Sequence, residues 1–177
     1  MTKPSSGTLK VAAVRVVWVQ NSEEPDEVVE RGFRLAAEAA AQGAKLIVFP
    51  ENFLHSRNPA DQMIPDGMLV KRTETFAKEH SVYVVAGIIE SWKFDWRQTY
   101  DTFLSAIVVG PEGYLSKHRK VDVNMVPYDR TWKPGMPKTD MDVWPGDDFA
   151  MHKAGPIERM GILICRDSNS SWAWTRV

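Results

Sequence analysis

The chain has 177 residues, of which 44% are hydrophobic and 25% charged, and its formal net charge at pH 7 is −1. This size and composition predict one soluble globular domain, and the near-neutral charge disfavours binding to nucleic acids or to anionic membranes. No apolar run approaches the roughly 18 residues that a membrane span needs.

Residues 1–8 lack the apolar stretch of a signal peptide and predict a short disordered tail. The single cysteine, Cys165, excludes an internal disulfide and is typical of a reducing compartment. We therefore expect a cytoplasmic protein.

The first half of the chain alternates between strand and helix patterns. β-Branched residues over 9–18 favour a strand, and the apolar runs 45–49 and 81–90 favour two more. Between these runs, apolar residues recur at helical spacing after Pro25 and over 68–79. The order predicts a strand–helix–strand–helix–strand unit.

The first of these helices has the clearer limits. Pro25 suits its first turn, and Gly43 suits the position after its last turn, where a left-handed residue ends many helices. The residues expected to point inward are Val29, Phe33, Ala36 and Ala40 in the first helix, and Leu69, Thr73 and Phe76 in the second.

The second half of the chain predicts two hairpins. Strand patterns over 101–109 and 114–121 flank the turn residues 110–113, and patterns over 149–153 and 159–164 flank a second turn. Together the elements predict an α/β (α+β) fold, a mixed sheet with helices on one face. Because little chain remains after the last strand, we expect the opposite face of the sheet to be bare.

Two segments that contain prolines, 52–67 and 122–148, predict loops, and the second is long enough to be functional or disordered. The tail 168–177 has room only for a short helix.

Three predicted strands end in reactive side chains. Glu51 follows one apolar run, the basic cluster 117–120 follows another, and Cys165 is the last residue of a third. Because open sheets expose their sites at the carboxyl ends of strands, we expect a carboxylate, an ammonium and a thiol to form one catalytic set. Alternation along a strand places Lys117 and Lys120 on opposite faces, and by itself it does not decide between them.

The segments that carry these groups resemble three motifs of the nitrilase superfamily of carbon–nitrogen hydrolases. The matching segments are 46–51, 114–121 and 161–167, with supporting matches at 108–113 and 134–135. They occur in the family's order and at about its spacings, and the resemblance covers the chain from Leu9 onward.

The resemblance implies an αββα sandwich, of which residues 9–177 would form the N-terminal portion, and a Glu-Lys-Cys triad. By motif, Glu51 is the general base, Lys120 the electrostatic stabiliser and Cys165 the nucleophile. The backbone N–H of Arg166 would help to bind the oxyanion. The implied reaction is hydrolysis of a small-molecule amide or carbamoyl compound through a thioester on the cysteine, without metal or cofactor.

The sequence departs from the family pattern after the lysine. Many members have a second glutamate between the lysine and the Pro-Gly pair at 134–135, and here that stretch contains none. Asp129 is the candidate accessory carboxylate, with a plain turn residue as its alternative reading. Trp132 is the candidate wall of the substrate pocket.

Length is the second departure, because only twelve residues follow Cys165 whereas family domains continue well beyond their nucleophile. The expected bare sheet face favours a homo-oligomer. A non-catalytic fragment or pseudoenzyme that acts through subunit association is therefore one alternative to the enzyme. A transferase that passes the acyl group of the thioester to an amine instead of to water is another.

The pair Arg166-Asp167 bears on the substrate. Many amidase and carbamoyl-amide branches of the family have a variable residue and then Asp after the nucleophile, whereas nitrile-hydrolysing members usually have Trp-Glu. The resemblance therefore favours an amide, with nitrile hydrolysis by the same triad as the alternative.

Overall fold

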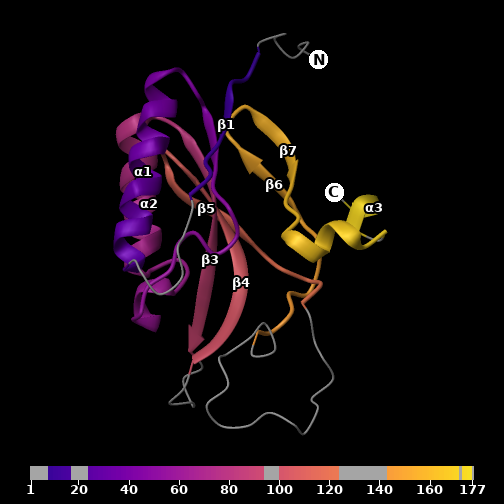
Figure 1. Ribbon diagram of the computed structural model, residues 1–177. Coiled ribbons are helices and arrows are strands. Elements are labelled where there is room, and N and C mark those ends of the chain that lie inside the picture. Colours follow the sequence, from indigo (N-terminus) through magenta and orange to yellow (C-terminus); the bar gives the residue numbers. More distant parts are fainter. Residues whose placement is uncertain (1–7, 17–23, 94–99, 124–142, 172, 177) are drawn as a thin grey trace, which may run out of the picture.

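The computed structural model describes residues 8–16, 24–93, 100–123, 143–171 and 173–176 (Figure 1). With η for a 3-10 helix, its elements are β1 (Val11–Ala13), α1 (Pro25–Ala41), β2 (Leu46–Val48), η1 (Pro59–Gln62), α2 (Met68–His80), β3 (Tyr83–Lys93), β4 (Tyr100–Gly110), β5 (Gly113–Arg119), β6 (Met151–Ala154), β7 (Ile157–Gly161), η3 (Cys165–Asn169) and α3 (Ala173–Arg176). Nearly all of the predicted tail 1–8 lies outside the described residues.

Five strands form one mixed sheet in the order β1-β2-β3-β4-β5. β1, β2 and β3 are parallel, and α1 and α2 lie in the connections between them. β3, β4 and β5 then form an antiparallel meander, in which the turn after Gly110 joins β4 to β5. The predicted mixed sheet and its first hairpin are therefore confirmed.

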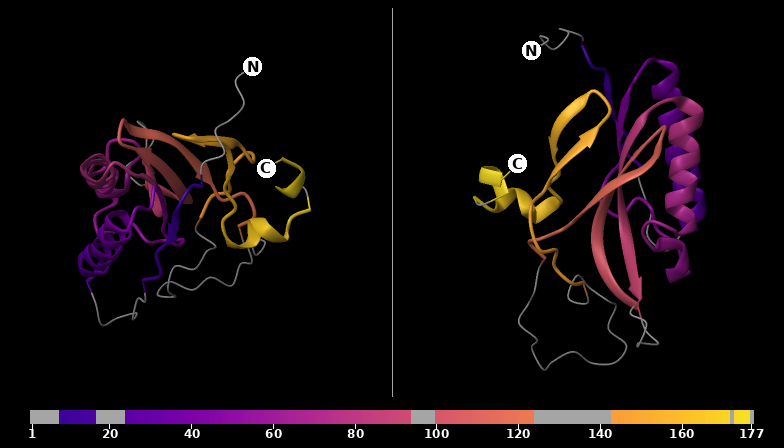
Figure 2. Two further views of the ribbon diagram at one scale, coloured as in Figure 1. Left: turned by 90° about the horizontal axis from the view of Figure 1, so that it is seen from above. Right: turned by 180° about the vertical axis from the view of Figure 1, so that it is seen from behind.

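Both long helices pack on the same face of this sheet (Figures 1 and 2). All but one of their predicted inward residues are buried, including Val29 and Phe33 of α1 and Leu69 of α2, and Ala40 is partly buried. These side chains share one apolar core with Ile47 of β2 and with residues of β3 and β4. The helical periodicity of the sequence therefore identified most of the residues by which the two helices pack against the sheet.

The other face of the sheet carries the β6–β7 hairpin, which forms a separate antiparallel pair (Figure 2). Ala154 of β6, together with Ile162 and Ile164 beyond β7, packs against Val85 and Val108 of the sheet. The expectation of a bare face is thus wrong for this part of the sheet, because the hairpin and the segment after it bury apolar residues there.

Several predicted boundaries differ from the structure. β1 is shorter than 9–18, because residues 14–16 lie outside the strand, and Trp18 is outside the described residues. The predicted loop 52–67 contains η1, and most of the predicted loop 122–148 is not described. None of the helices in the described ranges is both long and apolar enough to cross a membrane.

Candidate active site

Glu51 follows β2 at a point where the chain turns against β3. Leu54 N donates a hydrogen bond of 2.8 Å to the carbonyl oxygen of Gly87 in β3. A Cβ on Gly87 would lie 2.4 Å from the oxygen of Pro50 and 2.7 Å from the Cα of Glu51, so only glycine fits there without a shift of the backbone. Asn52, in the left-handed region with φ of 58°, completes the turn. The glutamate is therefore placed by a close contact between two backbones.

Lys120 comes directly after β5 and is 3% exposed. Its backbone N donates to Leu104 O at 2.8 Å, and its Nζ donates to Oε1 of Glu51, also at 2.8 Å. A lysine ammonium is rarely buried unless a carboxylate accompanies it, and Glu51 supplies one. The structure thus brings together two of the three side chains expected at the site.

Lys117, the other lysine of the basic cluster, lies on the opposite face of β5. Its Cα is paired with that of Ile107, which belongs to the core beneath the helices, whereas the neighbouring His118 is paired with Ala106 on the hairpin side. Lys117 Nζ donates to Oε1 of Glu90 at 2.5 Å. The alternation expected from the sequence is present, and Lys120 is the lysine that contacts Glu51.

Cys165 is not the last residue of a strand, which corrects the sequence-based expectation. β7 ends at Gly161, and Cys165 is the first residue of η3. The apolar character of the intervening run comes from burial, since Ile162 and Ile164 pack against the sheet without joining it. Apolar residues are favoured both in a strand of a buried sheet and in an irregular segment packed against a sheet. The apolar pattern of 161–164 therefore could not distinguish a strand from such a segment.

The backbone of Cys165 is in the left-handed region, with φ of 52°, and its side chain is exposed. For a residue other than glycine this conformation costs about 1–2 kcal/mol. Such strain persists only where surrounding contacts impose it, and it is concentrated at functional sites. Arg166 follows in the same turn, and its guanidinium Nε lies 3.4 Å from Oδ1 of Asp122.

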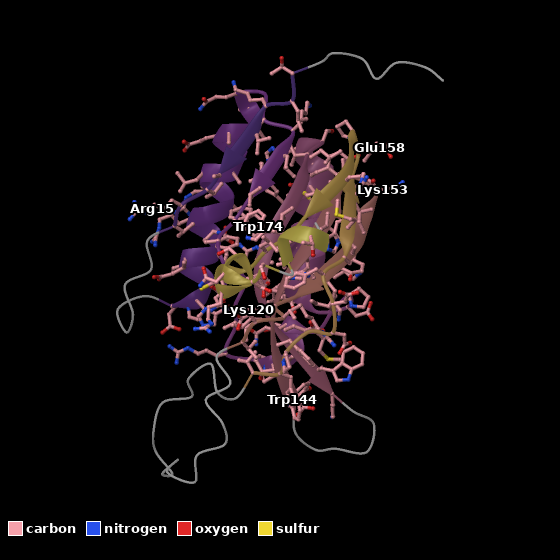
Figure 3. The ribbon with its side chains drawn as sticks, turned by 90° about the vertical axis from the view of Figure 1, so that its right-hand side faces the viewer. Arg15, Lys120, Trp144, Lys153, Glu158 and Trp174 are labelled. Atoms are coloured by element: carbon pink, nitrogen blue, oxygen red, sulfur yellow. The ribbon has the colours of Figure 1, made fainter. Side chains whose placement is uncertain are left out.

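Asp167 connects this turn to the lysine segment. Its carboxylate is fully buried, and its Oδ1 accepts hydrogen bonds from the backbone N–H groups of Val121 and Asp122, at 3.0 and 2.8 Å. These are the two residues that follow Lys120. Figure 3 shows Lys120 close to the C-terminal segment, in agreement with these bonds.

The other oxygen of Asp167 turns back to its own segment. Oδ2 accepts from the backbone N–H of Ile164 at 3.0 Å and from Nε2 of the buried His118 at 3.2 Å. Burial alone would raise the pKa of this carboxyl. The hydrogen bonds from His118 and from the N–H groups of Asp122 and Ile164 outweigh burial and hold the pKa below its ordinary value. The carboxylate is therefore ionised at neutral pH.

Sequence reasoning used Asp167 only as a signature of substrate class and gave no role to His118 or Gly87. Signals were present for Gly87 and His118. A lone glycine within an apolar strand indicates a close backbone approach, and His118 shares a strand face with Lys120 by alternation. For Asp167, an acidic residue two positions after Cys165, the sequence gave no indication that the side chain would turn inward.

A second carboxylate, Glu90, is fully buried on the helix side of the sheet. Its oxygens accept from the Ser105 hydroxyl at 2.6 Å, from Lys117 at 2.5 Å and from Arg119 at 2.9 and 2.5 Å. Burial would raise the pKa of Glu90, but the hydrogen bonds from Arg119, Lys117 and Ser105 hold it below its ordinary value. The guanidinium of Arg119 also lies 3.7 Å from the ring centre of Phe103.

A cavity of about 400 Å³ opens between β5 and β6 and is lined in part by Ser116 and His152. None of Glu51, Lys120 and Cys165 lines it, so this cavity is not the one that these side chains serve. Asp129, Trp132 and the pair 134–135 lie outside the described residues. In the part of the chain that the structure describes, no group of three or more His, Cys, Asp or Glu side chains could hold a metal ion.

Comparison with known proteins defines the class. Residues 10–176 match the sequence model of the carbon-nitrogen hydrolase family, and the chain belongs to this family. It is 35% identical over 166 residues to a nitrilase of Pyrococcus abyssi, a match that covers 87% of this chain and 56% of the relative. It is 33% identical over 162 residues to the human omega-amidase NIT2, covering 86% and 54%.

Solved structures show the same fold. Saccharomyces cerevisiae Nit3, a member of branch 10 of the nitrilase superfamily, superposes with a TM-score of 0.66 at 18% identity, over 89% of this chain and 56% of that one. An amidase from Nesterenkonia sp. gives a TM-score of 0.61 at 14% identity, over 89% and 55%. The nitrilase-type fold is thereby confirmed, and the chain spans about half the length of the relatives that it matches.

Proposed function

We propose that this chain hydrolyses a carbon–nitrogen bond other than a peptide bond, in a small amide or carbamoyl compound, with Cys165 as the nucleophile. The observation that carries the proposal is the contact of 2.8 Å between the buried ammonium of Lys120 and the carboxylate of Glu51. A base and a fixed positive charge side by side are the two groups that a thiol needs for acyl transfer.

In the first half of the reaction, Glu51 takes the thiol proton while the sulfur of Cys165 attacks the amide carbon. Negative charge develops on the carbonyl oxygen, where the Lys120 ammonium and the backbone N–H of Arg166 stabilise it. One such donor typically contributes about 100- to 1000-fold in rate. The C–N bond then breaks, and the protonated Glu51 gives its proton to the departing ammonia or amine.

The second half of the reaction releases the acid. A thioester remains on Cys165, and Glu51, again ionised, takes a proton from water as the water oxygen attacks the thioester carbon. The C–S bond breaks, the sulfur leaves as a thiolate, and it recovers a proton from Glu51. Within one turnover Glu51 accepts two protons, one from the thiol and one from water, and gives up both, to the departing amine and to the sulfur.

Relatives named as nitrilase and as omega-amidase are both similar to this chain, so similarity alone does not choose the substrate. Asp167 favours an amide, because the pair that it forms with Arg166 resembles the amidase and carbamoyl branches. Nitriles pass through a thioimidate on the same cysteine and belong in the same assay.

The test is ammonia release from a panel of small amides, carbamoyl compounds and nitriles. Cys165→Ala and Lys120→Met should each abolish release by folded protein. The matched control is Lys117→Met, which removes a lysine from the same basic cluster but on the Glu90 side of the sheet. Its folded fraction should keep most of the activity, since Lys117 does not contact Glu51.

Three results would contradict parts of the proposal. Release that survives Cys165→Ala would remove the thiol from the mechanism. Equal losses in Lys117→Met and Lys120→Met would remove the specific role of Lys120. Folded wild-type chain that releases nothing from any compound would favour the non-catalytic fragment, with association as its function.

A further inference from the structure

The two oxygens of Asp167 bind two different parts of the site. Oδ1 holds the backbone immediately after Lys120, and Oδ2 holds the N–H of Ile164, the residue immediately before Cys165. The carboxylate has no exposed surface. It is therefore one rigid link between the lysine and the cysteine turn, and it is not itself available to a substrate.

We propose that Asp167, oriented by His118, is a positioning residue that sets the placement of the Cys165 thiol relative to Lys120 and Glu51. The proposed function assigns roles to Glu51, Lys120 and Cys165, and Asp167 adds the contact that holds the cysteine in place relative to the other two. Its effect on turnover rests on the proposed function, whereas its effect on the thiol does not.

His118 is well suited to fix the carboxylate. Its side chain is 1% exposed, and its ring stacks on Phe149 with the ring centres 5.7 Å apart and the planes at 24°. The ring is therefore held on one side by the aromatic contact while Nε2 donates to Asp167 Oδ2. This packing fixes the orientation of the carboxylate, so that each oxygen faces its own segment.

The strained backbone of Cys165 gives this link a specific task. With φ of 52°, the residue is held in a conformation that it would leave if its neighbours allowed it. The bond from Ile164 N to Asp167 Oδ2 fixes the Leu163–Ile164 peptide, and the bond of 3.1 Å from Asp167 N to Ile164 O fixes the next peptide, which leads into Cys165. Without the first of these bonds, the turn can relax and the thiol can move away from the lysine.

The experiment uses Asp167→Asn and follows two independent quantities. The first is ammonia release, resolved into kcat and KM. The second is the rate of alkylation by iodoacetamide, which reports on Cys165 alone because the chain has no other cysteine. The alkylation rate is measured with Lys120 intact and with Lys120→Met, which gives a double-mutant cycle that does not depend on ammonia release.

The matched control is Asp122→Asn. That carboxylate also contacts the cysteine turn, through Arg166 at 3.4 Å, but it is 34% exposed. Asp122→Asn therefore removes one negative charge near the cysteine turn and leaves the hydrogen bonds of the Asp167 carboxylate intact. Its kcat, KM and alkylation rate should equal those of the wild type.

For Asp167→Asn we expect kcat to fall by about 100-fold with little change in KM, since a misplacement of about 1 Å at reacting groups can have that effect. Lys120→Met should slow alkylation in the wild-type background and leave it unchanged in Asp167→Asn. That loss of coupling distinguishes positioning from mere stability, which would lower the folded fraction and leave the coupling intact.

His118 supplies a milder second variant if Asp167→Asn does not fold. Gln places an amide nitrogen near the position of the histidine Nε2, whereas Ala does not. His118→Gln should therefore retain kcat and the coupling with Lys120, and His118→Ala should lose both.

The outcomes separate the two proposals. Coupling between Lys120 and thiol alkylation that disappears with Asp167, in a chain that releases no ammonia, would support positioning and contradict the hydrolase. Active wild-type chain in which Asp167→Asn retains kcat and the coupling would overturn positioning and leave the hydrolase in place. His118→Ala with wild-type kcat would overturn the role of the histidine.

Discussion

Two ion clusters, each with a carboxylate and at least one cation, lie on opposite faces of the sheet at the end of β5, and they differ in how fully the carboxylate is hydrogen-bonded. On the helix side, Glu90 is fully buried, and its oxygens accept from two cations and a hydroxyl. On the hairpin side, Glu51 contacts Lys120 through one oxygen, and its side chain remains 31% exposed. The first carboxylate has little capacity left for new partners, and the second keeps room for a proton and a substrate.

This contrast teaches how to separate a structural ion cluster from a reactive one when the residue types are the same. Saturated hydrogen bonding lowers the energy of one charge state and resists proton transfer. A carboxylate with one partner and an open side can exchange its proton during a reaction. Exposure and unused lone pairs, rather than the presence of Glu and Lys, distinguish the candidate reactive cluster.

The largest expected effect is on stability and comes from Glu90→Gln. The change leaves the partly buried cations Lys117 and Arg119 without their negative partner, and we expect a loss of about 3 kcal/mol in the free energy of unfolding. Glu51→Gln should lose less, about 2 kcal/mol, because its side chain is partly exposed and the amide oxygen can still accept from Lys120, although the buried ammonium loses its negative partner. Urea denaturation measures both values.

For activity, we expect Glu51→Gln to have the larger effect of the two variants. Glu51→Gln should release no ammonia, and folded Glu90→Gln should release it at nearly the wild-type rate. If Glu51→Gln proved the less stable variant of the pair, or Glu90→Gln the inactive one, the distinction between the saturated and the open cluster would be wrong.

The next effect is the response of stability to acid. The pKa of Glu90 is lower in the folded chain than its ordinary value, so the unfolded chain binds the proton more readily. The stability that Glu90 contributes is complete above the ordinary glutamate pKa of about 4.3 and is lost as the pH falls through the lower folded-state pKa. Asp167, whose pKa is also lowered, contributes in the same direction.

The measurement is urea denaturation of wild type and Glu90→Gln between pH 7 and pH 3. The difference in the free energy of unfolding between them should shrink as the pH falls below about 4.3. A difference that stayed constant down to pH 3 would mean that the charge of Glu90 is not what its partners stabilise.

The same contrast explains what the sequence could predict. The helix-covered core follows from periodicity, because Val29, Phe33 and Leu69 repeat at helical spacing and each is buried. The candidate reactive residues follow from short motifs at the ends of apolar runs. What the sequence could not give is the direction in which each polar side chain turns, since that depends on which distant backbone lies beside it.

Asp167 is the clearest case of this limit. Its neighbours in sequence suggest an exposed turn, yet its carboxylate is buried on backbone N–H groups that lie more than forty residues away along the chain. Cys165 illustrates the same limit for secondary structure, because hydrophobic burial under the hairpin produced a pattern typical of a strand. The sequence shows that Gly87 is a glycine within a predicted strand, but it does not show that the backbone at Glu51 lies against it.

The smallest expected effect concerns His152 at the edge of the hairpin side. This side chain is 4% exposed, its Nδ1 lies 2.8 Å from Ser116 Oγ, and burial and then the neighbouring His118 lower its pKa. The unfolded chain therefore binds a proton at this residue more readily than the folded chain. The stability of the fold should fall as the pH drops below about 6.5, the ordinary pKa of histidine.

His152→Asn tests this, because the Asn amide can still reach Ser116 and carries no charge at any pH. The free energy of unfolding should decline less between pH 7 and pH 5 in this variant than in the wild type. Some decline should remain, because burial and Arg57 also lower the pKa of His55. If the free energy of unfolding depends on pH equally in both proteins, His152 does not resist protonation in the fold. A weaker dependence in His152→Asn would show that the hairpin side keeps a buried histidine neutral, as the Glu90 cluster keeps a buried carboxylate charged. Neither group has a role in the proposed reaction.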